Sequence, residues 1–155
     1  MRIALAALLV LAQSIAFADT LTGRVVRVTD GDTIVVLDSA ITKTRSDSRA
    51  LICLKEAKPT ARNPRQHLSD AVAGKFVVVE YDKRDRYERI LGKVLLSDQD
   101  MNLEQVRAGL AWHYNKYERE QSSTDRVKYS DAEREARAVK RGLWLDANPS
   151  NQIQY

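Results

Sequence analysis

Runs of valine and other β-branched residues recur in the first two thirds of the chain and predict β-strands. The clearest pair of runs flanks the dipeptide Asp30-Gly31, a combination that is typical of the tight turn in a β-hairpin. A second pair flanks the densely charged residues 82–89, which we expect to form a surface loop. The four predicted strands cover residues 22–28, 33–37, 75–81 and 90–96.

Three later segments have the pattern of helices, and each of them ends at a glycine. In the second segment Leu103, Val106 and Leu110 fall on one face, which predicts a side packed on the core. Strands that precede helices indicate an α+β fold, with helices packed against a small closed sheet. The predicted helices cover residues 65–73, 102–108 and 125–141. We expect Leu143 and Trp144 to return to the core.

The first residues have the features of a secretory signal peptide. Arg2 gives a positive start, the apolar stretch 3–15 is too short to span a bilayer comfortably, and Ala16-Phe17-Ala18 is a cleavage pattern. We therefore expect a mature chain that starts at Asp19 and is periplasmic or secreted, without a membrane partner. The predicted parts are a signal peptide (1–18), one domain (19–148) and a C-terminal tail (149–155).

The composition excludes several kinds of site. A single cysteine, Cys53, rules out an intramolecular disulfide and a cysteine-rich metal site. Two scattered histidines are too few for a zinc cluster. The formal net charge of +4 suits a polyanionic partner such as nucleic acid, although an ordinary basic surface gives the same charge.

Two charged turns carry the residues that could do chemistry. Asp32 places a second carboxylate at the start of a strand, where it could bind a hard cation, and a solvated acidic turn is the alternative. Residues 82–89 combine arginines, which suit bidentate phosphate contacts, with Tyr87, on which a base could stack. A charged loop that keeps the protein soluble is the alternative for this segment.

Four short motifs occur in order and at suitable spacing. They are Val-Thr-Asp-Gly-Asp-Thr at 28–33, Asp-Arg-Tyr-Glu-Arg at 85–89, Met-Asn-Leu-Glu-Gln-Val-Arg-Ala-Gly-Leu-Ala-Trp at 101–112 and Arg-Gly-Leu-Trp at 141–144. Together they resemble the staphylococcal (micrococcal) nuclease family over residues 21–148, apart from a central stretch. The resemblance implies a five-stranded OB-type β-barrel with three helices, and a Ca²⁺-dependent phosphodiesterase acting on DNA and RNA. We expect such a protein to be a monomer.

The resemblance also implies roles for individual residues. Asp32 matches a calcium ligand, and Arg89 matches one of two arginines that clamp the scissile phosphate. Tyr87 matches a tyrosine that contacts the nucleotide, while Tyr114 and Tyr117 lie where family tyrosines line the nucleotide site.

One position in the charged loop departs from the family pattern. Glu88 stands where the family usually has the glycine of Tyr-Gly-Arg. If the turn needs a positive φ at this position, a non-glycine residue carries a strain of roughly 1 kcal/mol or more. The substitution also puts a negative charge beside the expected phosphate site.

The stretch 39–66 does not fit the family. The family has a strand here that reads Arg-Leu-x-Gly-Ile-Asp-x-Pro-Glu, which supplies the second clamping arginine, a second calcium aspartate and the general-base glutamate. Arg49 and Glu56 align with the missing arginine and glutamate only if a one-residue gap is allowed. They are the candidate catalytic residues of the present sequence, and incidental charges are the alternative.

The genetic code offers an explanation for this stretch. When codons for residues 45–55 are read one frame away, every fixed position of the family motif is permitted, in order and without gaps. We therefore hypothesise two compensating frameshifts, one shortly after Asp38 and one near Gln66. Divergence of an ordinary loop is the alternative.

The sequence thus favours a secreted Ca²⁺-dependent nuclease whose central active-site strand is frameshifted. A non-catalytic OB-type nucleic-acid-binding protein is an alternative, with Tyr87, Tyr114 and Tyr117 as the stacking surface. An inert, poorly folded product of a damaged gene is the third interpretation.

Overall fold

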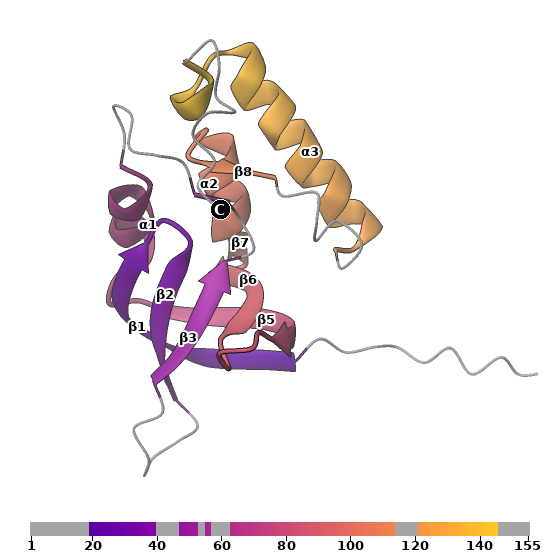
Figure 1. Ribbon diagram of the computed structural model, residues 1–155. Helices are drawn as coiled ribbons and strands as arrows, with labels where there is room; N and C mark the ends of the chain where they lie inside the picture. Colours follow the sequence, from indigo (N-terminus) through magenta and orange to yellow (C-terminus); the bar gives the residue numbers. More distant parts are fainter. Residues whose placement is uncertain (1–18, 40–46, 53–54, 57–62, 114–120, 146–155) are drawn as a thin grey trace, which may run out of the picture.

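The computed structural model describes residues 19–39, 47–52, 55–56, 63–113 and 121–145 (Figure 1). The predicted signal peptide, the predicted C-terminal tail, Tyr114 and Tyr117 lie outside the described residues. Within the described part of the chain, no helix is both long and apolar enough to cross a membrane.

A five-stranded barrel and three α-helices make up the described fold, which confirms the predicted α+β class with an OB-type barrel (Figure 1). The barrel strands run in the order β3-β2-β1-β5-β6, and a parallel pairing between β3 and β6 closes the ring. The barrel consists of β1 (Asp19–Asp30), β2 (Thr33–Asp38), β3 (Asp47–Ile52), β5 (Phe76–Arg84) and β6 (Ile90–Leu96). The other elements are β4 (Lys55–Glu56), β7 (Gln99–Asp100), β8 (Ala111–Trp112), α1 (Pro64–Val72), α2 (Met101–Arg107), α3 (Ser123–Ala138) and the 3₁₀ helix η2 (Gly142–Leu145).

The first hairpin forms as the sequence predicts. β1 and β2 pair antiparallel, and the last pair, Asp30 with Thr33, encloses Gly31 and Asp32 in a tight turn. Two register shifts in this pair show that the ladder is irregular near the turn. The turn therefore presents Asp32 at the end of the barrel, where Figure 1 shows α1 and α2 alongside.

The main core fills the barrel and extends under the helices. Its fully buried apolar side chains come from both hairpins and from α1 and α2: Val25, Ile34, Val36, Leu68, Val72, Val77, Val79, Ile90, Val94 and Val106. A second cluster contains Ala136, Leu143 and Trp144, with Trp112 packed against it. Leu143 and Trp144 therefore return to the core, as predicted.

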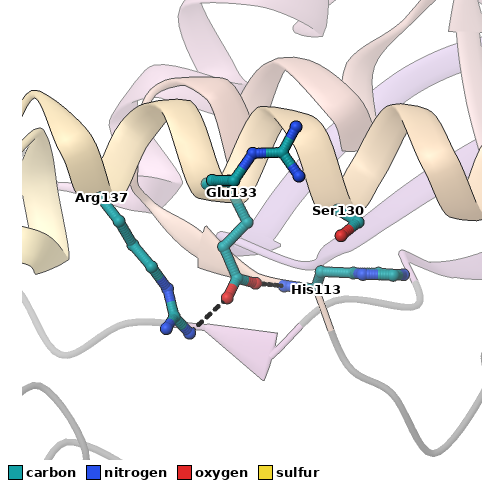
Figure 2. Close-up of a pocket in the computed structure, with 5 residues that line it drawn as sticks. His113, Ser130, Glu133 and Arg137 are labelled. Carbon is teal, nitrogen blue, oxygen red and sulfur yellow. Dashed lines mark hydrogen bonds and ion pairs between the residues drawn. The ribbon is translucent and has the colours of Figure 1, made fainter.

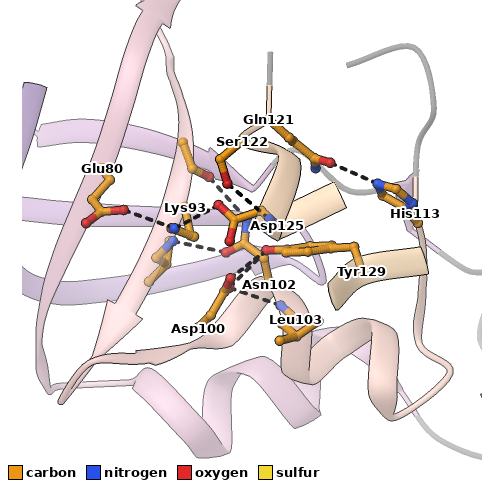
Figure 3. Close-up of polar contacts among 12 residues, drawn as sticks. Glu80, Lys93, Asp100, Asn102, Leu103, His113, Gln121, Ser122, Asp125 and Tyr129 are labelled. Atoms are coloured by element: carbon orange, nitrogen blue, oxygen red, sulfur yellow. Dashed lines mark hydrogen bonds and ion pairs between the residues drawn. The ribbon is translucent and has the colours of Figure 1, made fainter. Parts of the chain in front are cut away.

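Polar contacts attach α3 to the barrel (Figure 3). Lys93 of β6 makes ion pairs with Glu80 of β5 at 3.1 Å and with Asp125 of α3 at 3.2 Å. Burial opposes the charge of Lys93, but the two carboxylates outweigh burial and hold the pKa of Lys93 above its ordinary value. The Tyr129 hydroxyl donates to the Asp100 carboxylate at 2.8 Å, and that carboxylate also caps α2. These contacts attach the highly charged helix α3 to β6 and to the start of α2.

The differences from the predicted elements occur where pairing overrides local pattern. β5 extends to Arg84, because residues 83 and 84 pair with β6 in a segment that the sequence predicted to be loop. β3 and β4 form inside the stretch without a regular pattern. There, pairing with β2, β6 and β8 defines strands that the side-chain pattern did not predict.

Two of the glycines that end the predicted helices lie back to back. Gly109 follows α2 with φ +67°, and Gly142 opens η2 with φ +60°. A Cβ added at Gly109 would collide with the carbonyl of Arg141, and one added at Gly142 would collide with the carbonyl of Gly109. The backbone N–H of Leu143 donates to the Gly109 carbonyl at 2.8 Å, so this contact joins the ends of α2 and α3.

Candidate active site

Asp32 occupies a half-buried position at the start of β2 and is fixed by its neighbour. Its Oδ1 accepts a hydrogen bond from the Thr33 hydroxyl at 2.8 Å. Burial is the main influence on this carboxyl and raises its pKa, and the charge of Asp30 raises it further. The Thr33 hydrogen bond and the charge of Arg89 act in the opposite direction but do not cancel the increase. A bound cation would relieve this cost, which makes Asp32 a suitable metal ligand.

The influence of Arg89 on Asp32 shows that the two side chains lie within electrostatic reach. Arg89 stands at the end of the loop between β5 and β6, and Asp32 stands in the turn between β1 and β2. The structure therefore brings together two predicted site residues that are far apart in the sequence.

Asp85 holds Arg89 in place. Its carboxylate accepts from the Arg89 guanidinium Nε at 2.6 Å and forms an ion pair with Nη2 at 2.5 Å. The same carboxylate accepts the backbone N–H groups of Tyr87 and Arg89 at 2.8 and 3.0 Å. Desolvation opposes ionisation of Asp85, but these hydrogen bonds outweigh it and hold its pKa below the ordinary value. The loop is thus built around one carboxylate that orients the arginine.

Tyr87 is the exposed aromatic residue of this loop, with 62% of its surface accessible. The guanidinium carbons of Arg86 and Arg89 lie 4.7 and 5.2 Å from the centre of its ring. Stacked guanidinium groups beside an open ring form a surface that suits a base and its phosphate.

Glu88 has a φ of +60°, so the turn requires the left-handed conformation that the family supplies with glycine. Its backbone carbonyl accepts a hydrogen bond from Arg84 at 3.1 Å, and its side chain is exposed. The strain that the sequence analysis anticipated at this position is therefore present.

Replacing Glu88 with glycine should raise the free energy of unfolding by up to about 1 kcal/mol, because it removes the left-handed strain. Urea unfolding measures this difference. Glu88→Gln is the control, because it removes the charge and keeps the strain, so it should give no gain in stability. Both variants should bind an oligonucleotide more tightly than the parent. An equal gain in stability in both variants would show that the left-handed backbone at position 88 carries no strain.

For the candidates Arg49 and Glu56 the structure gives the position of the backbone, while Tyr114 and Tyr117 lie outside the described residues. Residues 50–52 pair with 90–92, which puts the chain just after Arg49 beside the chain just after Arg89. Glu56 pairs instead with Ala111 of β8, away from the β3–β6 ladder. In the described ranges, no group of three His, Cys, Asp or Glu residues is arranged to hold a metal ion. Asp30 and Asp32 are the carboxylates that the turn offers.

Sequence reasoning assigned no role to Gln105, which is 1% exposed on α2 and donates to the carbonyl of Gly31, next to Asp32. The sequence places this glutamine in the motif at 101–112, but it cannot show the role of Gln105, because its partners come from other segments.

A separate pocket lies along α3, lined by His113, Ser130, Glu133, Arg134 and Arg137 (Figure 2). Its charged groups already have partners. Glu133 accepts from the backbone N–H of His113 at 2.7 Å and pairs with Arg137 at 2.5 Å, while Arg134 pairs with Asp131 at 2.7 Å. The His113 contact joins the residue after β8 to α3, and the two ion pairs lie within α3, so the pocket has a structural explanation.

Comparisons with known proteins point to one family. A family model described as staphylococcal nuclease homologue matches residues 39–146. A protein of Escherichia coli named "Uncharacterized endonuclease" is 45% identical over 129 residues, covering 82% of this chain and 79% of that protein. A protein of the same name in Haemophilus influenzae is 33% identical over 134 residues, covering 86% and 72%. A "Micrococcal nuclease" of Shigella flexneri is 36% identical over 155 residues, covering 94% and 86%.

A closed five-stranded barrel with three packed helices defines an α+β protein of the OB-fold class. The chain belongs to the staphylococcal nuclease family.

Proposed function

We propose that this chain is a Ca²⁺-dependent nuclease that hydrolyses phosphodiester bonds in DNA and RNA. The observation that carries the proposal is that the charge of Arg89 acts on the half-buried carboxyl of Asp32, although the two residues come from different turns. A half-buried carboxylate within the electrostatic influence of a guanidinium suits a site in which a divalent cation and a phosphate bind together. The names of the related nucleases support the same activity.

In this proposal each described residue has one task. Arg89, oriented by Asp85, binds the scissile phosphate and stabilises the negative charge that develops on its oxygens. Asp32 would hold the cation, with Asp30 nearby, and bound Ca²⁺ would add charge stabilisation. Tyr87 would stack on the nucleotide. Arg49 and Glu56 stay candidates for the second arginine and the general base.

We also propose that residues 39–66 arise from the two compensating frameshifts. The support is that the offset frame permits the family motif, while β3 still pairs where the barrel needs a strand. Sequencing the gene tests this directly. Codons that do not encode Arg-Leu-x-Gly-Ile-Asp-x-Pro-Glu in the offset frame would refute it.

Export as a monomer to the periplasm or the medium completes the proposal. It rests on the charged start, the apolar stretch and the small-residue pattern before Asp19. N-terminal sequencing of the protein recovered outside the cytoplasm should begin at Asp19, and its elution volume should match one chain.

The activity is tested by digesting single-stranded DNA and RNA in millimolar Ca²⁺ or with a chelator. Both the present sequence and the offset-frame sequence are assayed. We expect Ca²⁺-dependent cleavage by the offset-frame protein, which regains the family's glutamate. Rates should be about 100-fold or more lower for the present sequence if Glu56 does not act as the general base, and similar if it does. Failure of both proteins to cleave, or cleavage that the chelator does not affect, would contradict the proposal.

Asp32→Asn should stabilise the metal-free fold while it weakens cation binding. Burial raises the pKa of Asp32 in the folded state above the ordinary 3.8, so ionised Asp32 costs stability as the pH rises above 3.8. The asparagine variant should therefore be more stable than the parent at pH 7, and the gain should disappear at pH 3, where both forms are neutral. Urea unfolding at both pH values measures this.

Asp131→Asn, an exposed change on α3, is the matched control for Asp32→Asn and should show neither effect. Unchanged Ca²⁺ affinity in Asp32→Asn would exclude Asp32 as the ligand.

A non-catalytic nucleic-acid-binding protein is the second candidate, favoured by the exposed ring of Tyr87 with two guanidinium groups close to it. Retention on single-stranded DNA without cleavage, in the presence of Ca²⁺, would support this alternative. A fluctuating core, seen as lost near-ultraviolet circular dichroism, would instead support an inert product of a damaged gene.

A further inference from the structure

Gln105 is a polar residue in an apolar place, and it joins three segments of the chain. It lies on α2 with 1% of its surface exposed. Its Nε2 donates to the carbonyl of Gly31 in the β1–β2 turn at 3.0 Å and to the carbonyl of Pro64 in α1 at 3.1 Å. Its Oε1 lies 2.6 Å from Nδ1 of His67, also in α1.

The hydrogen-bond inventory fixes the orientation of this group. Both donors of the Gln105 amide point to carbonyl oxygens, which accept only. Its Oε1 is an acceptor, so Nδ1 of His67 must carry the proton and donate to it. The amide therefore cannot flip without losing all three contacts, and His67 holds it in the orientation that the turn needs.

The contact to Gly31 acts on the peptide plane that links Gly31 to Asp32. The hydrogen bond from buried Gln105 fixes the Gly31 carbonyl and therefore the peptide plane. The orientation of that plane sets the position of the Asp32 backbone, from which the side chain extends. The turn sits beside two irregularities in the β1–β2 register, so the ladder alone constrains it less than a regular hairpin would. Gln105 supplies a constraint from the helical side.

We propose that Gln105, oriented by His67, is a positioning residue that holds the β1–β2 turn so that Asp32 is placed for the cation. This inference rests on the proposed function for the role of Asp32. It gives α1 and α2 a role in the site, in addition to their packing against the barrel.

The test compares Gln105→Met with Tyr129→Phe. Gln105→Met keeps the length of the side chain and removes the donors. Tyr129→Phe instead removes a part-buried hydrogen bond from α3 to Asp100, far from the turn in sequence. Calorimetry measures the Ca²⁺ dissociation constant, and NMR measures hydrogen exchange of the Asp32 amide in the metal-free protein. We expect Gln105→Met to weaken Ca²⁺ binding about tenfold and to speed exchange at Asp32, with Tyr129→Phe changing neither.

A second pair of variants covers the case in which Gln105→Met does not fold. His67→Asn keeps an N–H donor near the position of Nδ1 and should behave like the parent, whereas His67→Leu should weaken Ca²⁺ binding and speed exchange at Asp32. Equal effects of His67→Asn and His67→Leu would overturn the proposal, as would equal effects of Gln105→Met and Tyr129→Phe.

Failure of the proposed function gives a different result. A parent protein that binds no Ca²⁺ would refute the role of Asp32, while hydrogen exchange at Asp32 would still decide whether Gln105 holds the turn. Unchanged exchange in Gln105→Met would overturn the positioning role regardless of metal binding.

Discussion

Replacing Arg89 with lysine should lower the rate of phosphodiester cleavage by about 100-fold or more. The planar guanidinium offers donors to Asp85 and to a phosphate at the same time, while an ammonium is a single point of charge. Lysine would keep the positive charge but could not use one edge for its anchor and another for the substrate. The loss should appear in kcat/KM with single-stranded DNA in Ca²⁺.

Arg86→Lys is the matched control for this prediction. Arg86 lies in the same loop and stacks on the same Tyr87 ring, but Asp85 pairs with Arg89. We expect at most a few-fold loss for Arg86→Lys. Oligonucleotide binding gives the same comparison without requiring a general base, so it applies to the present sequence as well. Equal losses for the two variants would show that pairing with Asp85 gives Arg89 no role that Arg86 lacks.

Gly109→Ala and Gly142→Ala should each lower the free energy of unfolding by about 3 kcal/mol or more. Two costs combine at these positions: a left-handed φ that alanine adopts with strain, and a backbone carbonyl in the space that the methyl group would occupy. Relief requires the ends of α2 and α3 to move apart. This would also break the hydrogen bond from Leu143 to Gly109 and disturb the cluster around Trp144.

Gly74→Ala separates the two costs. Gly74 has a φ of +73°, similar to the other two, but a Cβ there would meet only the Arg24 guanidinium, at 3.8 Å. Its loss should be about 1 kcal/mol, the conformational cost alone. Urea unfolding of the three variants measures the difference. Three equal losses would mean that the close contact between Gly109 and Gly142 contributes nothing to stability.

Local pattern was enough to predict the elements whose side chains repeat regularly. The predicted strand over 90–96 has the same bounds as β6, and the three helices begin and end within a few residues of the predicted limits. Glycines at 74, 109 and 142 all have positive φ. The short strands β4 and β8 could not be predicted, because two residues carry no period and only their pairing with each other defines them.

The site was predictable where a motif carries it. Asp32 and Arg89 were predicted from different motifs, and the structure brings them within electrostatic reach. The positive φ at Glu88 also follows from the motif, because glycine normally stands there. Asp85 and Gln105 also lie inside motifs but were assigned no role, because their roles depend on partners that only the folded chain supplies.

The parallel ladder between β3 and β6 has a consequence for solubility. A closed barrel has no free edge, and among the described residues this one closes through Ala50, Leu51 and Ile52 against residues 90–92. If that short seam opens, β3 and β6 each present unpaired backbone groups that can recruit a strand from another molecule. Aggregation during folding should therefore respond more strongly to changes in residues 50–52 than to changes in the outer face of α3.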